Sequence, residues 1–154
     1  MIETITFDEL QWLHILNPEE EDYTYLLDNY GFHPLDIEDC RAINQRPKID
    51  EYDDYYFLIL HFPYLDKSNK FIRMKEVKIF WGKDYIITIG RSHWAVKNLC
   101  KQTQESRQTY NTSDELLYNI LDRLMVETYT LILRIGTEVD RINYDIFTKK
   151  PQRI

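Results

Sequence analysis

The alternation of apolar and polar residues predicts strands and helices in turn along the chain. Strands are expected over residues 3–7 and 10–16. A helix is then expected from Asn17 to Tyr30, with Asn17 as the N-cap and Pro18 in the first helical position. Its apolar face repeats at i, i+3, i+4 and i+7, as a helix packed on a core requires. The residues on this face are Tyr23, Leu26, Leu27 and Tyr30.

Residues 31–41 predict a turn followed by a short acidic helix. Gly31 ends the preceding helix, because a residue without a side chain adopts positive φ at little cost. His33-Pro34 starts the next one, since Pro is suited to the first helical position. Three apolar residues are expected to anchor this helix: Leu35, Ile37 and Cys40. Three carboxylates are expected to point outward: Asp36, Glu38 and Asp39.

The next segments predict an antiparallel meander. Arg46-Pro47 stops further helix, because the residue before Pro is pushed to extended geometry. A strand is expected from residue 49 onward. Residues 55–62 are apolar or aromatic except for His61, and such a continuous run favours a strand covered on both faces. After a turn over 66–70, an imperfectly alternating strand over 72–80 and a Gly82-Lys83-Asp84 hairpin lead to a strand over 85–89.

Two helices are expected to complete the chain. The first runs from about residue 94 to 107, with Val96, Leu99 and Cys100 facing inward. The second is long, is capped by Ser113, and carries apolar residues at coiled-coil-like spacings with one slip near Gly136. A second apolar face of this helix predicts that its first half packs on the sheet. The residues on this face are Ile120, Met125 and Ile132. Residues 137–154 are too polar for a core helix and are expected to pack on another helix outside this sequence.

The elements together predict a single α/β domain over residues 1–154. Its sheet is mixed but largely antiparallel, is sandwiched by helices, and is followed by the long C-terminal helix. A length of 154 residues suits one domain with a real core. The two cysteines lie far apart without a C-x-x-C partner, so neither a zinc site nor a disulfide framework is expected. No signal peptide and no apolar run near ~20 residues is found, so the chain as given is expected to be soluble.

Charge is distributed unevenly along the chain. Residues 1–54 hold 15 acidic and three basic residues, whereas the remainder holds 11 acidic and 16 basic residues. Such blocks are typical of solvated faces. The alternative interpretation is a face that attracts cations, because the acids gather at 19–22, 36–39 and 50–54. Nucleic acid is not an expected partner, since its recognition requires a basic stripe.

Catalytic motifs are missing from the sequence. There is no Gly-rich phosphate loop, H-E-x-x-H or nucleophile elbow, and the four histidines lack ligand spacing. The neighbouring acids Glu38 and Asp39 point about 100° apart on a helix, so they do not form a facing pair. We therefore do not expect an enzyme.

Metal binding is the chemistry that the acidic helix favours. Asp36, Glu38 and Asp39 offer hard oxygen ligands, which suit Mg²⁺ or Ca²⁺ better than zinc or copper. Mg²⁺ keeps several waters and needs only one or two carboxylates, so a sparse site is sufficient. The alternative is that all three are simply solvent-facing helix charges.

Two adjoining motifs resemble a known family. H-P-L-x-x-E-D at 33–39 and Q-R-P-K-x-x-x-Y-D-D-Y-x-F-L at 45–58 are similar to the signature of the CorA family of divalent-cation channels, in its N-terminal cytoplasmic domain. L-L-Y-N-I-L-D at 116–122 and V-D-R-I-N-Y-D-I-F at 139–147 resemble the family's long helices. The resemblance extends from the strand around Trp12 to the region of Ile146.

The resemblance implies a regulatory domain at the cytoplasmic face of the cell membrane. CorA proteins are pentameric Mg²⁺ channels in which divalent ions bound between subunits hold the pore closed. The resemblance implies that the metal ligands are Asp39, Glu38 and Asp122, with Mg²⁺ as the regulatory ion and Co²⁺ or Zn²⁺ as substitutes. The G-M-N motif, membrane helices and stalk helix of the family are missing from this sequence. Residues 137–154 are thus the start of a stalk-proximal region, and this chain alone is expected to be a monomer or dimer.

Three functions therefore remain open. The first is the sensor of a CorA-like channel, whose partners are its own stalk and transmembrane region and further copies of the chain. A variant of it is the corresponding domain of a zinc or other divalent-cation transporter of the same superfamily. The second is a soluble interaction module that dimerises by its last helix. The third, a soluble enzyme, is the least expected.

Overall fold

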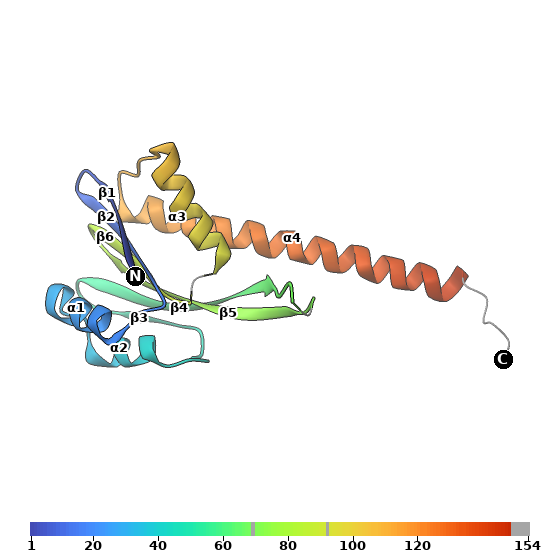
Figure 1. Cartoon of the computed structure of the whole chain (residues 1–154), viewed down its shortest axis with the longest axis horizontal. Helices are drawn as coiled ribbons and strands as arrows, with labels where there is room; N and C mark the ends of the chain where they lie inside the picture. Colours follow the sequence, from blue (N-terminus) through green and yellow to red (C-terminus); the bar gives the residue numbers. More distant parts are fainter. Residues whose placement is uncertain (69, 92, 149–154) are drawn as a thin grey trace.

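A six-stranded sheet organises the molecule, whose computed structural model describes residues 1–68, 70–91 and 93–148 (Figure 1). The strands are β1 (Ile2–Phe7), β2 (Leu10–Leu16), β3 (Lys48–Glu51), β4 (Tyr55–Leu65), β5 (Ile72–Gly82) and β6 (Tyr85–Gly90). Their spatial order is β1-β2-β6-β5-β4-β3. Only β2 and β6 pair in parallel among these strands, and the other neighbours are antiparallel. The predicted mixed, largely antiparallel sheet is confirmed.

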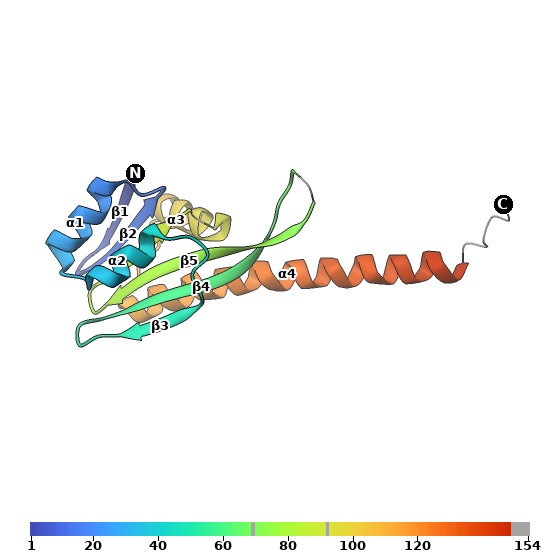
Figure 2. The ribbon, with the colours of Figure 1, turned by 90° about the horizontal axis from the view of Figure 1, so that it is seen from below.

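Helices cover both faces of the sheet. The helices α1 (Glu20–Tyr30) and α2 (Pro34–Arg41) lie on one face, and α3 (Trp94–Ser106) and α4 (Ser113–Thr148) lie on the other (Figures 1 and 2). Alternate residues of a strand point to opposite faces. On β4, Phe57 and Ile59 therefore join the core under α1 and α2, whereas Leu58 joins the core under α3 and α4. This burial on both faces explains the unbroken apolar run that predicted a covered strand.

The connection from β2 to α1 differs from the prediction. Asn17 is not the N-cap: its φ is +48°, and its N–H donates to the Gly90 carbonyl at 3.0 Å, which holds Asn17 against the end of β6. Glu19 is the N-cap instead, and its N–H donates to Asp22 Oδ2 at 3.0 Å in a capping box. The helix ends at Tyr30, and Gly31 follows with a φ of +64°, as predicted.

The start of α4 also differs from the prediction. Ser113 is not the capping side chain, because Thr112 Oγ1 accepts the N–H of Glu115 at 3.2 Å. The buried hydroxyl of Ser113 instead accepts a hydrogen bond from the Trp81 indole at 3.2 Å. Ser113 therefore attaches the helix to the sheet.

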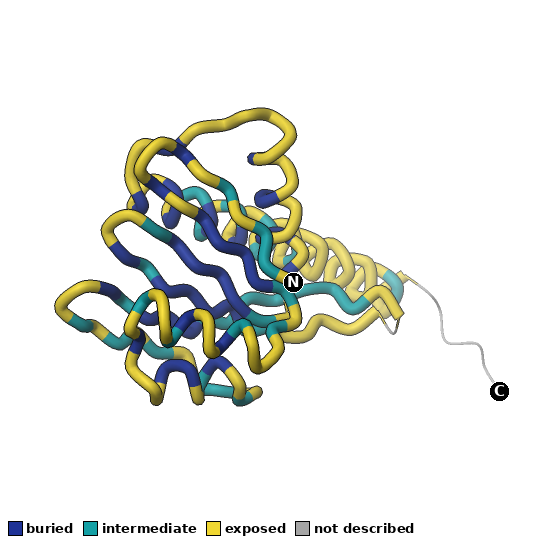
Figure 3. Tube along the Cα trace, turned by 60° about the vertical axis from the view of Figure 1, so that its left-hand side comes forward, coloured by how far each residue is buried: buried dark blue, intermediate teal, exposed yellow. Residues whose placement is uncertain are grey.

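The long helix packs on the sheet over a shorter stretch than predicted. Its buried apolar residues are Leu116, Leu117, Ile120 and Leu124. Met125 and Ile132 are exposed, so the predicted second core face is wrong except at Ile120. Met125 directly follows the buried Leu124 and points about 100° away from it around the helix. Ile132 lies where the helix has become exposed, as α4 extends away from the sheet into solvent (Figures 1 and 3). Asn69, in the predicted 66–70 turn, and residues 149–154 lie outside the described residues.

Candidate metal centre

Helix α2 is fixed at its N-terminus by His33. The His33 ring accepts the N–H of Leu35 through Nδ1 at 3.2 Å, so His33 is the N-cap of the helix that His33-Pro34 was predicted to start. The backbone N–H of His33 donates to the Tyr55 hydroxyl at 2.9 Å, so the start of the helix is also tied to β4. Ile37 and Cys40 are buried as predicted. Leu35 is 60% exposed and is not an anchor, because the bonded first turn directs its side chain away from the sheet.

The C-terminus of α2 is fixed by a buried lysine of β5. Lys78 donates from its ammonium to the carbonyls of Ala42, Asp39 and Cys40 at 2.6, 2.9 and 3.3 Å. The same ammonium lies 3.2 Å from Glu76 Oε2. A cation is favoured here, because the last carbonyls of a helix lack backbone partners and carry partial negative charge. Lys78 therefore sets where the last turn of α2, with Asp39 on it, meets the sheet.

Asp36 lies inside the fold and not on the surface, so its predicted outward direction is wrong. The Tyr52 hydroxyl donates to Asp36 Oδ1 at 2.9 Å, and the Tyr55 hydroxyl donates to Oδ2 at 2.8 Å. Burial raises the pKa of Asp36, and the two tyrosine hydrogen bonds partly offset this effect. Tyr52 lies in the turn before β4, and Tyr55 is the first residue of β4. Both hydroxyls reach Asp36 because this part of the chain folds back onto α2.

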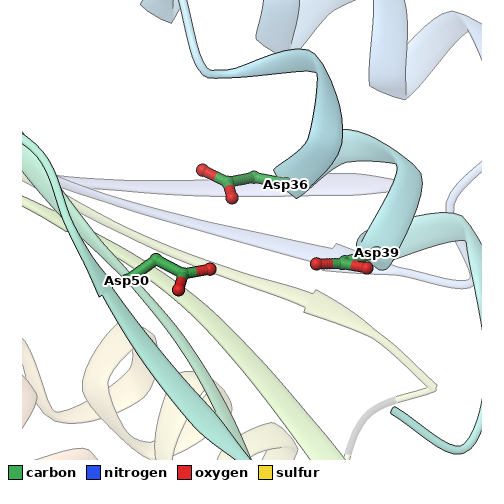
Figure 4. Close-up of side chains that lie close together, drawn as sticks. All are labelled: Asp36, Asp39 and Asp50. Carbon is green, nitrogen blue, oxygen red and sulfur yellow. The ribbon is translucent and has the colours of Figure 1, made fainter. Parts of the chain in front are cut away.

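Three carboxylates converge where α2 faces β3. Asp36, Asp39 and Asp50 each place one oxygen within 4.8 Å of the others (Figure 4). Such a set of hard oxygen ligands suits Mg²⁺ or Ca²⁺. Within residues 1–68, 70–91 and 93–148, it is the one group of three or more potential metal-ligating side chains this close together. We call these three residues the acidic group.

A lysine occupies part of the acidic group. Lys48 Nζ lies 2.6 Å from Asp39 Oδ2 and 2.5 Å from Asp50 Oδ2. Lys48 and Asp50 are two residues apart on β3, so their side chains leave the same face of the strand. Although burial opposes the charged ammonium, the hydrogen bonds to Asp39 and Asp50 raise the pKa of Lys48. This lysine remains charged at neutral pH.

The predicted metal ligands are placed apart within one chain. Asp39 belongs to the acidic group, whereas Glu38 is exposed on α2 outside it. Asp122 is exposed on α4, which covers the opposite face of the sheet (Figures 1 and 2). A site that uses Glu38, Asp39 and Asp122 together therefore needs a second copy of the chain. Asp50 was not singled out as a ligand, although the predicted acidic face included 50–54.

The fold is shared with solved structures of larger proteins. The full-length CmaX protein superposes with a TM-score of 0.79 at 20% identity, over 92% of this chain and 44% of that one. The soluble domain of CorA from Methanocaldococcus jannaschii gives a TM-score of 0.73 at 16% identity, over 90% of this chain and 56% of that one. The architecture is therefore that of the soluble domain of a CorA protein.

Sequence similarity identifies the family. Residues 7–154 match the family described as CorA-like Mg²⁺ transporter protein. YfjQ of Bacillus subtilis (strain 168) is 31% identical over 150 residues, 92% of this chain and 43% of its own length. The cobalt/magnesium transport protein CorA of Thermotoga maritima is 23% identical over 150 residues, 92% of this chain and 41% of its own length. The chain belongs to the CorA-like Mg²⁺ transporter family, a family of transport proteins and not of enzymes.

The chain spans less than half the length of these two relatives. Among the helices of the described residues, none combines the length and the apolarity that crossing a bilayer requires.

Proposed function

We propose that this chain is the divalent-cation-sensing domain of a CorA-like transporter at the cytoplasmic face of the membrane. The observation that carries the proposal is the place of Asp39. It lies at the end of a helix fixed at both ends, in a group of three carboxylates, within the motif that resembles the family's metal-site motif. In this proposal Mg²⁺ binds between subunits and stabilises the closed assembly.

The separation of the ligands supports a site between subunits. Glu38 and Asp122 are exposed on helices that cover opposite faces of the sheet, so they are available to neighbouring copies on two sides. Carboxylates that meet at such a boundary repel each other, and a divalent cation relieves this repulsion. Because the ion binds only the closed arrangement tightly, its differential affinity shifts the equilibrium toward closure.

The outer half of α4 supports partners beyond this domain. Its exposed apolar residues include Ile132, Leu133, Val139, Ile142 and Ile146. In the proposal they pack on the protein's own stalk region within a homo-oligomer, a pentamer in the family, which extends to the transmembrane region. The alternative function, a module that dimerises through α4, uses this same apolar surface.

The identity of the ion is taken from the relatives. One is named for cobalt and magnesium transport, and the magnesium transporter ALR1 of Saccharomyces cerevisiae is 28% identical over 88% of this chain and 16% of its own length. A solved ZntB cytoplasmic domain from Vibrio parahaemolyticus shares the fold with a TM-score of 0.67. We therefore propose Mg²⁺ as the regulatory ion, with Co²⁺ or Zn²⁺ as substitutes.

The test uses the full-length gene product in membranes. Ion current is recorded as Mg²⁺ is varied, together with Mg²⁺ protection against limited proteolysis. Asp39→Ala is expected to weaken Mg²⁺-dependent closure most, followed by Glu38→Gln and Asp122→Asn. Asp28→Asn, an exposed carboxylate of α1, is the matched control and should leave closure unchanged. Unchanged Mg²⁺ sensitivity in Asp39→Ala contradicts the assignment, and a gene product without membrane helices favours the dimerising module.

A further inference from the structure

Lys48 is the cation nearest to the proposed metal ligand. Its Nζ lies 2.6 Å from Asp39 Oδ2 and 2.5 Å from Asp50 Oδ2. Both are distances of charge-assisted hydrogen bonds. Asp36, Asp39 and Asp50 each place one oxygen within 4.8 Å of the others, so the ammonium lies within the acidic group that contains the proposed ligand Asp39.

The surroundings strengthen this contact beyond that of an ordinary surface ion pair. The side chains of Lys48, Asp39 and Asp50 are 34%, 23% and 35% exposed, so water screens them only in part. Lys48 follows Pro47 and is the first residue of β3, where pairing with Ile59 of β4 fixes its backbone. Asp39 is held from the other side by α2, whose last carbonyls bind Lys78. The fixed positions of β3 and α2 therefore hold the Lys48 ammonium next to Asp39.

We propose that Lys48 is a tethered counter-ion that competes with the divalent cation for Asp39 and so sets the Mg²⁺ concentration at which the site fills. This inference rests on the proposed function, because it takes Asp39 as a metal ligand. A positive ammonium and Mg²⁺ a few ångströms apart repel each other, so Lys48 must leave Asp39 when the ion binds. A tethered group acts at an effective concentration of about millimolar or more, which shifts filling of the site to higher Mg²⁺.

Lys48 retains a partner after its release. Asp50 lies on the same strand and bonds the same ammonium, so Lys48 can move toward Asp50 without becoming an unpaired charge. The two states then differ in which cation neutralises Asp39: Lys48 when Mg²⁺ is scarce, Mg²⁺ when it is plentiful. Without Mg²⁺, Lys48 also prevents repulsion among the three carboxylates from loosening the contact between α2 and β3.

The opposite role makes the opposite prediction. If Lys48 only positions Asp39 for the ion, its removal must weaken Mg²⁺ binding. If Lys48 competes, its removal must strengthen Mg²⁺ binding. The direction of the change therefore distinguishes competition from positioning.

The experiment is a Mg²⁺ titration of the full-length gene product, read as the half-maximal concentration for closure and for protection from proteolysis. Lys48→Gln is expected to lower this concentration roughly two- to fivefold, the range expected when one partly exposed ion pair, that with Asp39, no longer competes with the ion. Lys48→Arg keeps the competing charge. The half-maximal Mg²⁺ concentration should therefore stay unchanged or rise, because Arg pairs with carboxylates more strongly. Lys101→Gln removes an exposed lysine with its own ion pair on α3 and should have no effect.

Further variants keep the result interpretable. In the Asp39→Ala background, Lys48→Gln should not lower the half-maximal Mg²⁺ concentration, because the carboxylate for which Lys48 and Mg²⁺ compete is missing. Lys48→Met is used if Lys48→Gln does not fold, and unfolding of both variants shows that Lys48 is structural and overturns the inference. An unchanged or higher half-maximal Mg²⁺ concentration in Lys48→Gln also overturns it. If wild type does not respond to Mg²⁺, or responds independently of Asp39, the proposed function itself fails.

Discussion

Tyr55 and Asp36 are joined by a hydrogen bond of 2.8 Å that links β4 to the first turn of α2. Both side chains are buried, and the same hydroxyl accepts the backbone N–H of His33. Tyr55→Phe therefore removes one hydrogen-bond partner from the buried Asp36 carboxylate and one from the backbone N–H of His33, which is expected to cost about 1–3 kcal/mol of stability. Urea denaturation measures the loss. Tyr56→Phe, which removes a solvent-side hydroxyl bonded to Glu51, is the control and should leave the midpoint unchanged.

Lys78 is expected to be among the most sensitive positions of the domain. Lys78→Met leaves the carbonyls of Asp39 and Ala42 without their donor and leaves Glu76 without its cation. Removal of one partner from such a buried set costs about 3–5 kcal/mol. The denaturation midpoint should fall accordingly, whereas Lys101→Met, on the exposed surface of α3, should barely change it. Equal midpoints in the two variants contradict this account.

Stability should fall as the solution becomes acidic near pH 6. Burial is the main cause that lowers the pKa of His14 and of His93 below the ordinary value of 6.5. The unfolded chain therefore binds protons in this range that the folded chain does not, so unfolding is favoured as pH falls. This stability is fully present above about pH 6.5 and is lost as pH falls from there toward the folded pKa values.

Denaturation at a series of pH values measures this dependence. His93 accepts the N–H of Ala95 as the cap of α3, a role that Asn also performs. His93→Asn should therefore keep the fold and reduce the slope of stability against pH. A slope equal to that of wild type shows that His93 does not contribute.

Two glycines should respond to the same substitution in opposite ways. Gly31 has a φ of +64° and open space where a Cβ would lie, so Gly31→Ala adds backbone strain alone, about 1 kcal/mol. Gly136 lies inside α4, also with open space around it, so Gly136→Ala should favour the helix by about 0.5–1 kcal/mol. Thermal denaturation followed at a helix-sensitive wavelength compares them. Destabilisation by both contradicts the assigned backbone roles.

The fold was largely predictable, because turn residues separate its helices and strands. Gly31, Pro47 and Gly82 mark boundaries that agree with the structure within a residue or two. The errors lie where a tertiary contact overrides a local preference. Asn17 suits an N-cap by type, yet its N–H donates to the carbonyl of Gly90, which ends the neighbouring strand β6 and lies far away in the sequence. No local pattern indicates this contact.

The candidate site was predictable only in part. The resemblance pointed to Asp39, which does lie in the acidic group, but an eight-residue helix is too short for its periodicity to show that Asp36 faces inward. The residues that make this burial possible, Tyr52 and Tyr55, follow α2 by more than ten positions. Asp50 and Lys48 join the site only because β3 is placed opposite α2.

The parallel pairing of β2 with β6 imposes an order on folding during synthesis. His14 of β2 lies opposite Thr88 of β6, 74 residues later in the chain. At roughly 5–20 residues per second, a ribosome needs about 4–15 s to make the intervening segment. During this interval the first hairpin presents Trp12 and Leu13 without the strand that later covers its inner edge. The β1–β2 hairpin is made before β6 and is thus among the last parts of this sheet to complete its pairing.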